Sequence, residues 1–390
     1  MCSSDLWSYV SDVIVIGGGP AGSTAARICA KAGLSTRVLE EHASLGYPVQ
    51  CAGLLSNNAF AECEVSDRSV YNTVRGAKIC GSEGHSLSFD PKTTKAYVVD
   101  RGRLDHEMAV SAAEAGAEFS LKTCVTKINP EKRIIHTADG EEIPYEILIA
   151  ADGPRSVVAR SLGIPPSRFI YSGIQAEIPW DGDPSLVELH PNTAPEFFAW
   201  VIPLSEKRAR LGLCGTKNVP DLFAKFLSRF PGSTIHSVTG TIPIGIRCRT
   251  FGSGCMLIGD AAGFPKPTSG GGVYTGVRSA RYAAQTAIES FDASDTTDTF
   301  LSRYEKIWRE DFGRELDMGL KALEFRRNLD PEDIDAVIDA LNTPEILDLI
   351  VRYGDMDRPS DLLKRLAMKP GLYGTFGRVG IKGIVRSVLG

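Results

Sequence analysis

The stretch 13-VIVIGGGPAGS-23 decides the fold of this chain. Four apolar residues run into a glycine turn, an alanine-rich segment follows, and a second strand-like run lies at 35–41. A buried strand, a tight turn, a helix and a second strand in this order predict one βαβ unit. Gly17, Gly19 and Gly22 have the GxGxxG spacing and lie between the strand and the helix, as that motif requires.

This glycine turn predicts a dinucleotide site. In the motif the first glycine permits the tight turn, the second lets the backbone approach a pyrophosphate, and the third lets helix and strand pack closely. Glu40 ends the second strand 18 residues after Gly22 (40 − 22 = 18), where an acid can bind adenosine ribose hydroxyls. A glutamate here favours FAD or NAD over NADP. The alternative is a glycine turn with only a structural role.

A downstream segment, 257-LIGDAAGFPKPTSGGGVYTG-276, favours FAD over NAD. A strand delivers Asp260, whose carboxylate suits a ribityl hydroxyl, and Gly271 and Gly272 precede a second alanine-rich helix. The N-terminus of that helix can face the flavin pyrimidine, where negative charge develops on reduction. The alternative is an ordinary strand and turn with a solvated Asp260.

The rest of the chain predicts a mixed α/β fold with three parts. We expect a discontinuous Rossmann-like FAD-binding domain, an inserted antiparallel β-sheet domain for the substrate, and a helical C-terminal region. The predicted FAD-binding domain consists of residues 1–75, 98–168 and 246–310; the predicted sheet domain of 76–97 and 169–245; the predicted C-terminal region of 311–390.

Composition excludes several classes of function. A formal net charge of −5 gives no bulk attraction to nucleic acid, so a nucleic-acid partner is disfavoured. The nine cysteines lack CxxC or CxxH spacing and the six histidines lack ligand spacing, so we predict no metal site. No basic and apolar leader is recognisable, and no run of about 18 apolar residues suggests a membrane span. The chain is therefore predicted to be cytoplasmic.

At this point the chain resembles a known family. GGGPAGS at 17–23, ADGPRS at 151–156 and GDAAG at 259–263 resemble the para-hydroxybenzoate hydroxylase type of flavoprotein. Within that superfamily, PVQCAGLLS at 48–56 and FFAWVIP at 197–203 resemble the geranylgeranyl reductases, in particular archaeal enzymes that saturate isoprenoid chains of membrane lipids. The resemblance implies bound FAD and an isoprenoid lipid substrate.

The resemblance also implies roles for individual residues. Gly17, Gly19, Ala21 and Gly22 would meet the pyrophosphate and Glu40 the ribose, while other residues would line the flavin, its phosphate side or the adenine. These other cofactor residues are Cys51, Ala52, Arg101, Val125, Asp260, Gly271, Gly272 and Val273. The aromatic strand would form the apolar substrate pocket, with Phe198, Trp200 and Pro203. For Arg101 the alternative is a surface arginine at a helix start, and for the strand it is an ordinary sheet core.

Cys51 is the candidate catalytic residue. A thiol in apolar surroundings stays protonated, so Cys51 could donate a hydrogen bond or a proton beside the flavin. Some relatives have Cys-Gly-Glu-Gly where this chain has Cys51-Ala-Gly-Leu, and a tyrosine where this chain has Phe198. Both departures remove polar groups. The alternative is a small buried residue that only packs against the ring.

Two further functions fit the same fold: an aromatic hydroxylase, in which reduced flavin meets oxygen, and a non-catalytic flavoprotein that relays electrons. Only one dinucleotide fingerprint is visible, so electrons must come from a reducing partner: NADPH, a ferredoxin or a deazaflavin. The stretch 361–390 has six basic residues and one acid, Asp361. It could rest on an anionic membrane surface as a peripheral contact, or pack as a basic amphipathic helix on the domain.

Overall fold

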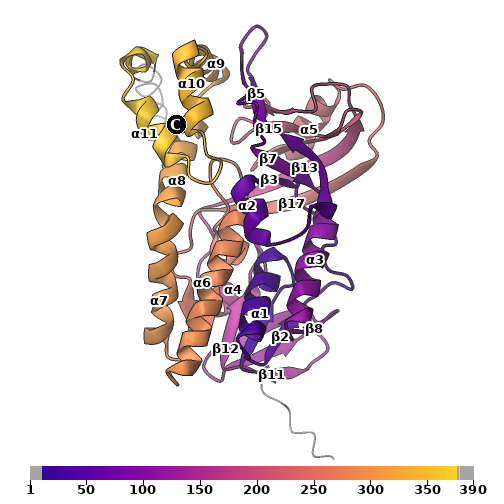
Figure 1. The fold of residues 1–390 in the computed structure, drawn as a ribbon, viewed down its shortest axis with the longest axis vertical. Helices are drawn as coiled ribbons and strands as arrows, with labels where there is room; N and C mark the ends of the chain where they lie inside the picture. Colours follow the sequence, from indigo (N-terminus) through magenta and orange to yellow (C-terminus); the bar gives the residue numbers. More distant parts are fainter. Residues whose placement is uncertain (1–10, 376, 378–390) are drawn as a thin grey trace, which may run out of the picture.

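The computed structural model describes residues 11–375 and 377. Figure 1 shows two sheet regions, one above the other, with helices along one side of the lower sheet and a separate group of helices beside the upper sheet. This arrangement confirms the predicted fold class of a Rossmann-like domain, an antiparallel sheet and a helical C-terminal region.

The lower region is built on a six-stranded sheet in the order β18-β19-β12-β1-β2-β8. Strands β19 to β8 are parallel, and β18 joins β19 antiparallel. All four residues of β1 are buried because it lies at the centre, between β12 and β2. The strands are β1 Val13–Ile16, β2 Thr36–Leu39, β8 Glu118–Ser120, β12 Ile147–Ala150, β18 Phe251–Gly252 and β19 Cys255–Leu257.

The upper region is a seven-stranded sheet in the order β17-β13-β16-β15-β14-β5-β6, antiparallel except for the parallel pair β14 and β5. Its strands come from 76–89 and 169–244: β5 Gly76–Cys80, β6 Ser86–Phe89, β13 Phe169–Pro179, β14 Leu186–His190, β15 Ala199–Ser205, β16 Arg208–Gly215 and β17 His236–Ile244. Two three-stranded sheets complete the β-structure: β3 Leu54–Ser56, β7 Ala96–Val99 and β4 Val70–Val74; β11 Glu142–Pro144, β10 Ile134–Thr137 and β9 Val125–Asn129.

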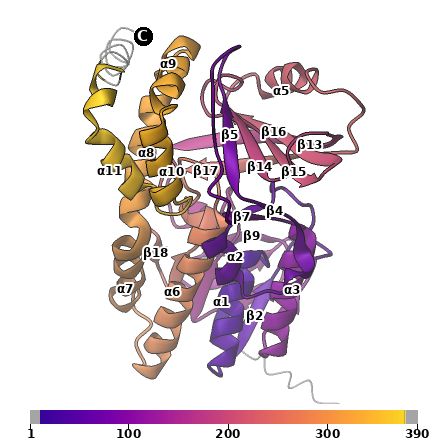
Figure 2. The same cartoon turned by 45° about the horizontal axis from the view of Figure 1, so that its top comes forward.

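The helices fall into three groups. Those packed around the lower sheet are α1 Pro20–Lys31, α2 Asn57–Cys63, α3 Arg101–Glu114, α4 Val157–Ser161, α6 Val273–Asp292 and α7 Asp298–Trp308. The C-terminal group, α8 Arg314–Arg327, α9 Pro331–Leu341, α10 Pro344–Tyr353 and α11 Ser360–Ala367, stands across from the seven-stranded sheet in Figure 2. Helix α5, Val219–Leu227, covers the outer face of that sheet. The sequence predicted only strands there, but Phe223 and Phe226 bury an apolar helix face on the sheet.

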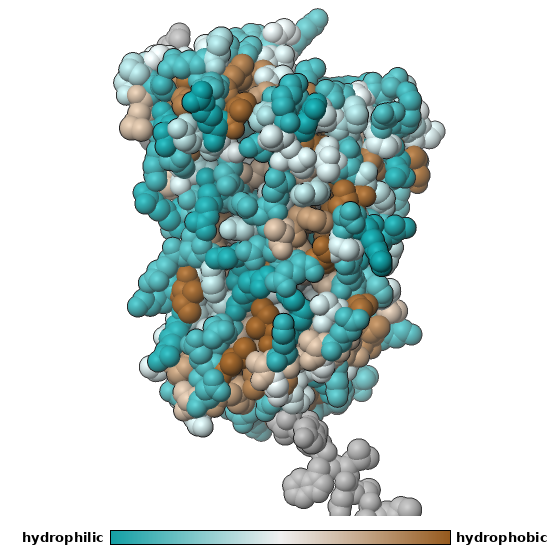
Figure 3. All heavy atoms as spheres, in the orientation of Figure 1, coloured by the Kyte–Doolittle hydropathy of each residue, from teal (hydrophilic) through white to brown (hydrophobic). Residues whose placement is uncertain are grey.

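The face of the molecule drawn in Figure 3 is largely hydrophilic. On the face drawn in Figure 3, apolar residues form separate spots among hydrophilic ones. Among the residues that the structure describes, no helix combines the length and the apolar character needed to cross a bilayer.

Trp308 anchors helix α7 in the core of the lower region. Its side chain is fully buried, packs 4.7 Å from the Phe264 ring centroid, and donates an Nε1–H hydrogen bond of 3.0 Å to the Thr250 hydroxyl. We therefore expect Trp308→Ala to lower the free energy of unfolding by about 3–5 kcal/mol in denaturant titrations. Phe325→Ala, at a side chain that is 38% exposed, serves as the control, with a loss below about 1 kcal/mol. Equal losses in the two variants would contradict this account of the core.

Candidate functional site

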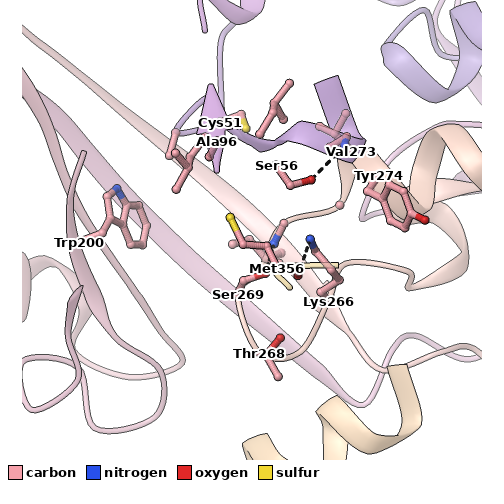
Figure 4. A pocket seen from close by; sticks show the side chains of 18 of the residues that line it. Cys51, Ser56, Ala96, Trp200, Lys266, Thr268, Ser269, Val273, Tyr274 and Met356 are labelled. Atoms are coloured by element: carbon pink, nitrogen blue, oxygen red, sulfur yellow. Dashed lines mark hydrogen bonds between the residues drawn. The ribbon is translucent and has the colours of Figure 1, made fainter. Parts of the chain in front are cut away.

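A cavity of about 1100 Å³ lies where the lower sheet, the seven-stranded sheet and the C-terminal helices meet. It brings together most of the residues that the sequence singled out: Gly19, Ala21, Gly22, Cys51, Ala52, Arg101, Phe198, Trp200, Asp260, Gly271, Gly272 and Val273. Four predicted site residues, Gly17, Glu40, Val125 and Pro203, are not part of its lining. Figure 4 shows the Cys51 loop, Trp200 and the start of α6 around the same space.

The glycine turn opens α1 toward the cavity. Gly17 has φ +97°, and a Cβ at Gly22 would lie 1.9 Å from the Gly17 carbonyl oxygen, so neither position accepts a side chain. A Cβ at Gly19 would meet nothing within 4 Å. Since no side chain caps α1, its first amide N–H groups are free to bind an anion such as a pyrophosphate.

Glu40 lies behind the glycine turn, at the end of β2. Its carboxylate accepts hydrogen bonds from the amide N–H groups of Gly18, at 2.8 Å, and His42, at 2.9 Å. The Glu40 carbonyl accepts a third, at 2.8 Å, from the amide of Thr123, two residues before the buried Val125. Glu40 and Val125 thus belong to one corner of the domain, next to the pyrophosphate turn, and their contacts with the adenosine half of a cofactor stay a prediction.

Asp260 faces the N-terminus of α6. A Cβ at Gly272 would lie 2.9 Å from an Asp260 carboxylate oxygen, and α6 begins at Val273 without a side-chain cap. Among the described residues, none forms a hydrogen bond with this carboxylate. Burial raises the pKa of Asp260 to about 6, and the positive charge of Arg101 opposes that rise.

These features fit FAD. Two uncapped helix N-termini converge on one cavity, and a glycine-rich backbone leaves room for phosphates. Within the described part of the chain, the carboxylate of Asp260 has no hydrogen-bond partner. A flavin dinucleotide offers phosphates to the first helix and ribityl hydroxyls to the carboxylate.

Cys51 has an ionic pair beside it, which the sequence analysis missed. Arg101 and Asp105 form a two-point salt bridge of 2.9 and 3.0 Å, with both side chains about nine-tenths buried. Desolvation would lower the pKa of Arg101, but Asp105 and the neighbouring Cys51 sulfur outweigh it and raise the pKa. The sequence analysis placed Cys51 in apolar surroundings and named Arg101 for the cofactor, but it did not foresee that helix α3 places this cation next to the thiol.

Two polar side chains of the seven-stranded sheet hold the Cys51 loop. Gln175 Nε2 donates to the Cys51 carbonyl at 3.0 Å, and Arg210 Nη1 donates to the Ala52 carbonyl at 2.9 Å. Arg210 also pairs with Glu177 at 3.2 Å. The sequence analysis missed both residues; the available signal was a polar side chain within an otherwise apolar strand.

The aromatic strand β15 forms the apolar wall. Phe198, Trp200 and Ile202 line the cavity, as expected for alternate residues of a strand. Pro203 is instead buried outside the cavity, next to a bulge, and its carbonyl accepts a hydrogen bond from Asn72. Its predicted place in the substrate pocket is not supported, and Ile202 takes that place because of the period-2 alternation.

Strand pairing also brings together one set of potential metal ligands. Cys80, Glu188 and His190 have ligand atoms within 4.8 Å of one another, since β5 and β14 lie side by side. Their strand neighbours Ile79 and Leu189 line the cavity, so these three side chains belong to the other face of the sheet. Spacing along the chain could not reveal this cluster, so the reason given for predicting no metal site was incomplete.

The Asp260 carboxylate gives a pH-dependent prediction for the cofactor-free protein. Its folded pKa of about 6 lies above the ordinary value of 3.8, so ionisation of this carboxylate destabilises the folded state. The destabilisation is absent below about pH 4, where the group is protonated in both states, and is fully present above about pH 6. We expect Asp260→Asn to unfold at a higher temperature than wild type at pH 7, with the difference vanishing towards pH 4. The same variant should bind FAD about 10 to 100 times more weakly, since it loses a charged hydrogen bond. Unchanged FAD affinity in a flavin titration would contradict the assignment.

Comparisons with known proteins agree with this site. Residues 10–220 match the family model of an FAD binding domain. The chain is 31% identical to digeranylgeranylglycerophospholipid reductase 2 of Methanothermobacter thermautotrophicus, over 86% of this chain and 92% of the relative. It is 30% identical to a protein of the same name from Methanopyrus kandleri, over 87% and 92%.

A solved structure of a related protein has the same fold. The crystal structure of a geranylgeranyl bacteriochlorophyll reductase-like protein from Thermoplasma acidophilum superimposes with a TM-score of 0.81, 28% identity, and coverage of 92% of this chain and 98% of that one. The chain is an FAD-dependent oxidoreductase and belongs to the digeranylgeranylglycerophospholipid reductase family.

Proposed function

We propose that this protein saturates the C=C double bonds of geranylgeranyl chains in archaeal membrane lipid precursors. The observation that carries the proposal is that one cavity contains both a cofactor site and an apolar wall. Asp260 and two helix N-termini form the cofactor site, and Phe198 and Trp200 belong to the apolar wall. An isoprenoid chain is apolar along its length, and such a wall binds it by removing apolar surface from water. The names of the relatives point to the same substrate class.

The chemistry requires a hydride and a proton on adjacent carbons. FAD, when bound and reduced, supplies the hydride. An isolated alkene has no carbonyl to accept negative charge, so a proton donor must lie close to the second carbon. Cys51 lines the same cavity as Trp200 and is the donor in this proposal.

Arg101 lies beside Cys51 in the same cavity and supports this role by its position. Donation of the Sγ proton leaves a thiolate, and the guanidinium beside it stabilises that negative charge. Asp105 keeps the guanidinium in place through their two hydrogen bonds. Solvent must then return a proton to the sulfur before the next turnover.

The remaining parts of the proposal concern partners. A reducing partner, namely NADPH, a ferredoxin or a deazaflavin, supplies the electrons. We also propose a cytoplasmic protein with a peripheral membrane contact through the basic C-terminal stretch. Of its six basic residues, Arg378, Lys382 and Arg386 lie outside the described residues; Arg365 and Lys369 pair with Asp361 and Glu345.

The central test is an anaerobic reaction. The bound flavin is reduced with dithionite, excess dithionite is removed, and a geranylgeranyl lipid is added. We expect flavin reoxidation together with a mass gain of two hydrogens per double bond in the lipid. An unchanged lipid, together with oxygen consumption that depends on an added aromatic substrate, would favour the aromatic hydroxylase instead. A reduced flavin that reacts with neither would favour the electron relay.

Replacement of Cys51 tests the proton donor. Cys51→Ala removes the acid, so we expect the rate of lipid reduction to fall by about 10²-fold or more, with dithionite reduction of the flavin unchanged. Cys248→Ser, at an exposed cysteine, serves as the control and should keep the wild-type rate. A fully active Cys51→Ala variant would remove the donor role and leave Cys51 as a packing residue.

Replacement of Trp200 tests whether the apolar wall binds the lipid chain. Trp200→Ala deletes a large apolar surface from the cavity, so the KM for a geranylgeranyl lipid should rise by about tenfold or more, while the affinity for FAD stays the same. The measurement is steady-state lipid reduction at several lipid concentrations, with a flavin titration beside it. An unchanged KM would contradict the place of the lipid chain.

A further inference from the structure

A buried ionic cluster joins the C-terminal helices to the cavity wall. The Asp357 side chain is 0% exposed, and its carboxylate lies 2.5 Å from the ammonium of Lys266, which is 9% exposed. Its second oxygen accepts a hydrogen bond of 2.5 Å from the Ser56 hydroxyl. Lys266 also donates to the Met356 carbonyl at 2.9 Å. Every polar group of this cluster thus has a partner, as a buried ion pair requires.

The three residues come from three distant parts of the chain. Ser56 ends β3 and caps α2, five residues after Cys51 (56 − 51 = 5). Lys266 lies in the loop between Asp260 and α6, and Asp357 in the turn between α10 and α11. Figure 4 shows Ser56, Lys266 and Met356 around the start of α6. The cluster therefore ties the Cys51 side of the site, the flavin-facing loop and the C-terminal helices to one point.

The C-terminal helices form a wall of the cavity at this point. We call residues 344–367, which comprise α10, α11 and the turn between them, the C-terminal lobe. Its side chains in the cavity lining are mainly apolar: Ile350, Val351, Met356, Pro359 and Leu362. Away from the cavity the lobe is tied to the 309–327 helical segment by Arg358 with Asp311, at 2.6 Å, and by Ser360 with Glu315. Asp357 ties the lobe to Lys266 on the cavity side.

Lys266 brings positive charge close to the N-terminus of α6. A Cβ at Gly271 would lie 3.5 Å from Lys266 Cε and 3.8 Å from Nζ, and the Lys266 amide donates to the Gly271 carbonyl at 3.1 Å. This is the backbone predicted to face the flavin pyrimidine. A cation next to it favours negative charge on that ring, and the Asp357 carboxylate offsets part of that effect.

We propose that Asp357 is a positioning residue with two linked effects. It holds the C-terminal lobe in place as an apolar wall of the cavity, and it sets the net charge beside the start of α6 through Lys266. As far as the lobe contacts an isoprenoid chain, this role rests on the proposed function. Without the Asp357 carboxylate, the lobe keeps the hydrogen bond from Lys266 to the Met356 carbonyl but loses its ionic contact on the cavity side, and the buried ammonium of Lys266 is left without its counter-charge.

The test uses Asp357→Asn holoenzyme, which keeps the shape of the side chain and removes its charge. Hydrogen exchange of residues 344–367, followed by mass spectrometry, should become about tenfold faster or more. The flavin reduction potential, measured at the same pH in both proteins, should shift by about 30 mV or more to positive values, equivalent to a tenfold change in a two-electron equilibrium. A purely structural role would leave the potential unmoved.

A matched control comes from the same lobe. Glu345→Gln breaks the pair of Glu345 with Lys369, in which the Glu345 side chain is 70% exposed, and should change neither measurement. The proposal requires both changes in Asp357→Asn, so wild-type exchange or a wild-type potential overturns it. If Asp357→Asn does not fold, the double variant K266M/D357N removes both buried charges together. That variant should also loosen the lobe, and unchanged exchange in it would overturn the proposal.

Both measurements are made without lipid, so they separate the two proposals. Holoenzyme that fails to reduce geranylgeranyl lipid, while Asp357→Asn shows both changes, would refute the proposed function and leave the positioning role intact. If wild type reduces the lipid, Asp357→Asn should raise the KM for lipid by about tenfold, because the wall is less ordered.

Discussion

The close approach of α1 to the end of β1 is the constraint on which the site depends. A Cβ at Gly22 would lie 1.9 Å from the Gly17 carbonyl oxygen, so the helix can start there only if residue 22 is glycine. The second half of the site lies close to the same helix. Cβ atoms at Gly259 and Gly276 would lie 3.5 and 3.6 Å from the Ala21 methyl group, which is ordinary contact distance, so α6 and its preceding loop start beside α1. Both helix N-termini consequently open into one cavity.

The cavity has a polar end and an apolar end because different parts of the chain build them. Asp260, Arg101 and Asp105 come from the Rossmann-like part. Arg101 and Asp105 form a salt bridge with each other, and the charge of Arg101 also acts on the buried Asp260. The aromatic wall comes from the antiparallel sheet, whose strands present alternate side chains to the cavity. Cys51 lies on the loop between them, fixed from the sheet by Gln175 and flanked by Arg101. This position suits a group that must meet a cofactor and an apolar substrate at once.

The sequence predicted the parts of the site that are encoded locally. The glycine turn, Asp260 and the start of α6 each lie within a short segment, so the pattern of that segment alone is enough to predict a cofactor site there. The sequence did not predict residues whose partners are distant along the chain. Gln175 holds Cys51 from 124 residues away, and Asp357 pairs with Lys266 from 91 residues away. Along β15, the alternation of side chains places Ile202 in the cavity lining and leaves Pro203 out of it. The Cys80, Glu188 and His190 cluster was not predicted, since it depends on which strands pair.

The account's central claim is that one cavity holds the flavin and the isoprenoid chain together. Photolabelling of the FAD-loaded protein with a geranylgeranyl lipid that carries a diazirine in its chain, followed by peptide mapping, tests this claim most directly. The account predicts labels in segments 197–202, 267–274 and 350–362, and their loss when unlabelled geranylgeranyl lipid competes. Labels confined to surfaces outside the cavity, or labels that no competitor removes, would contradict it.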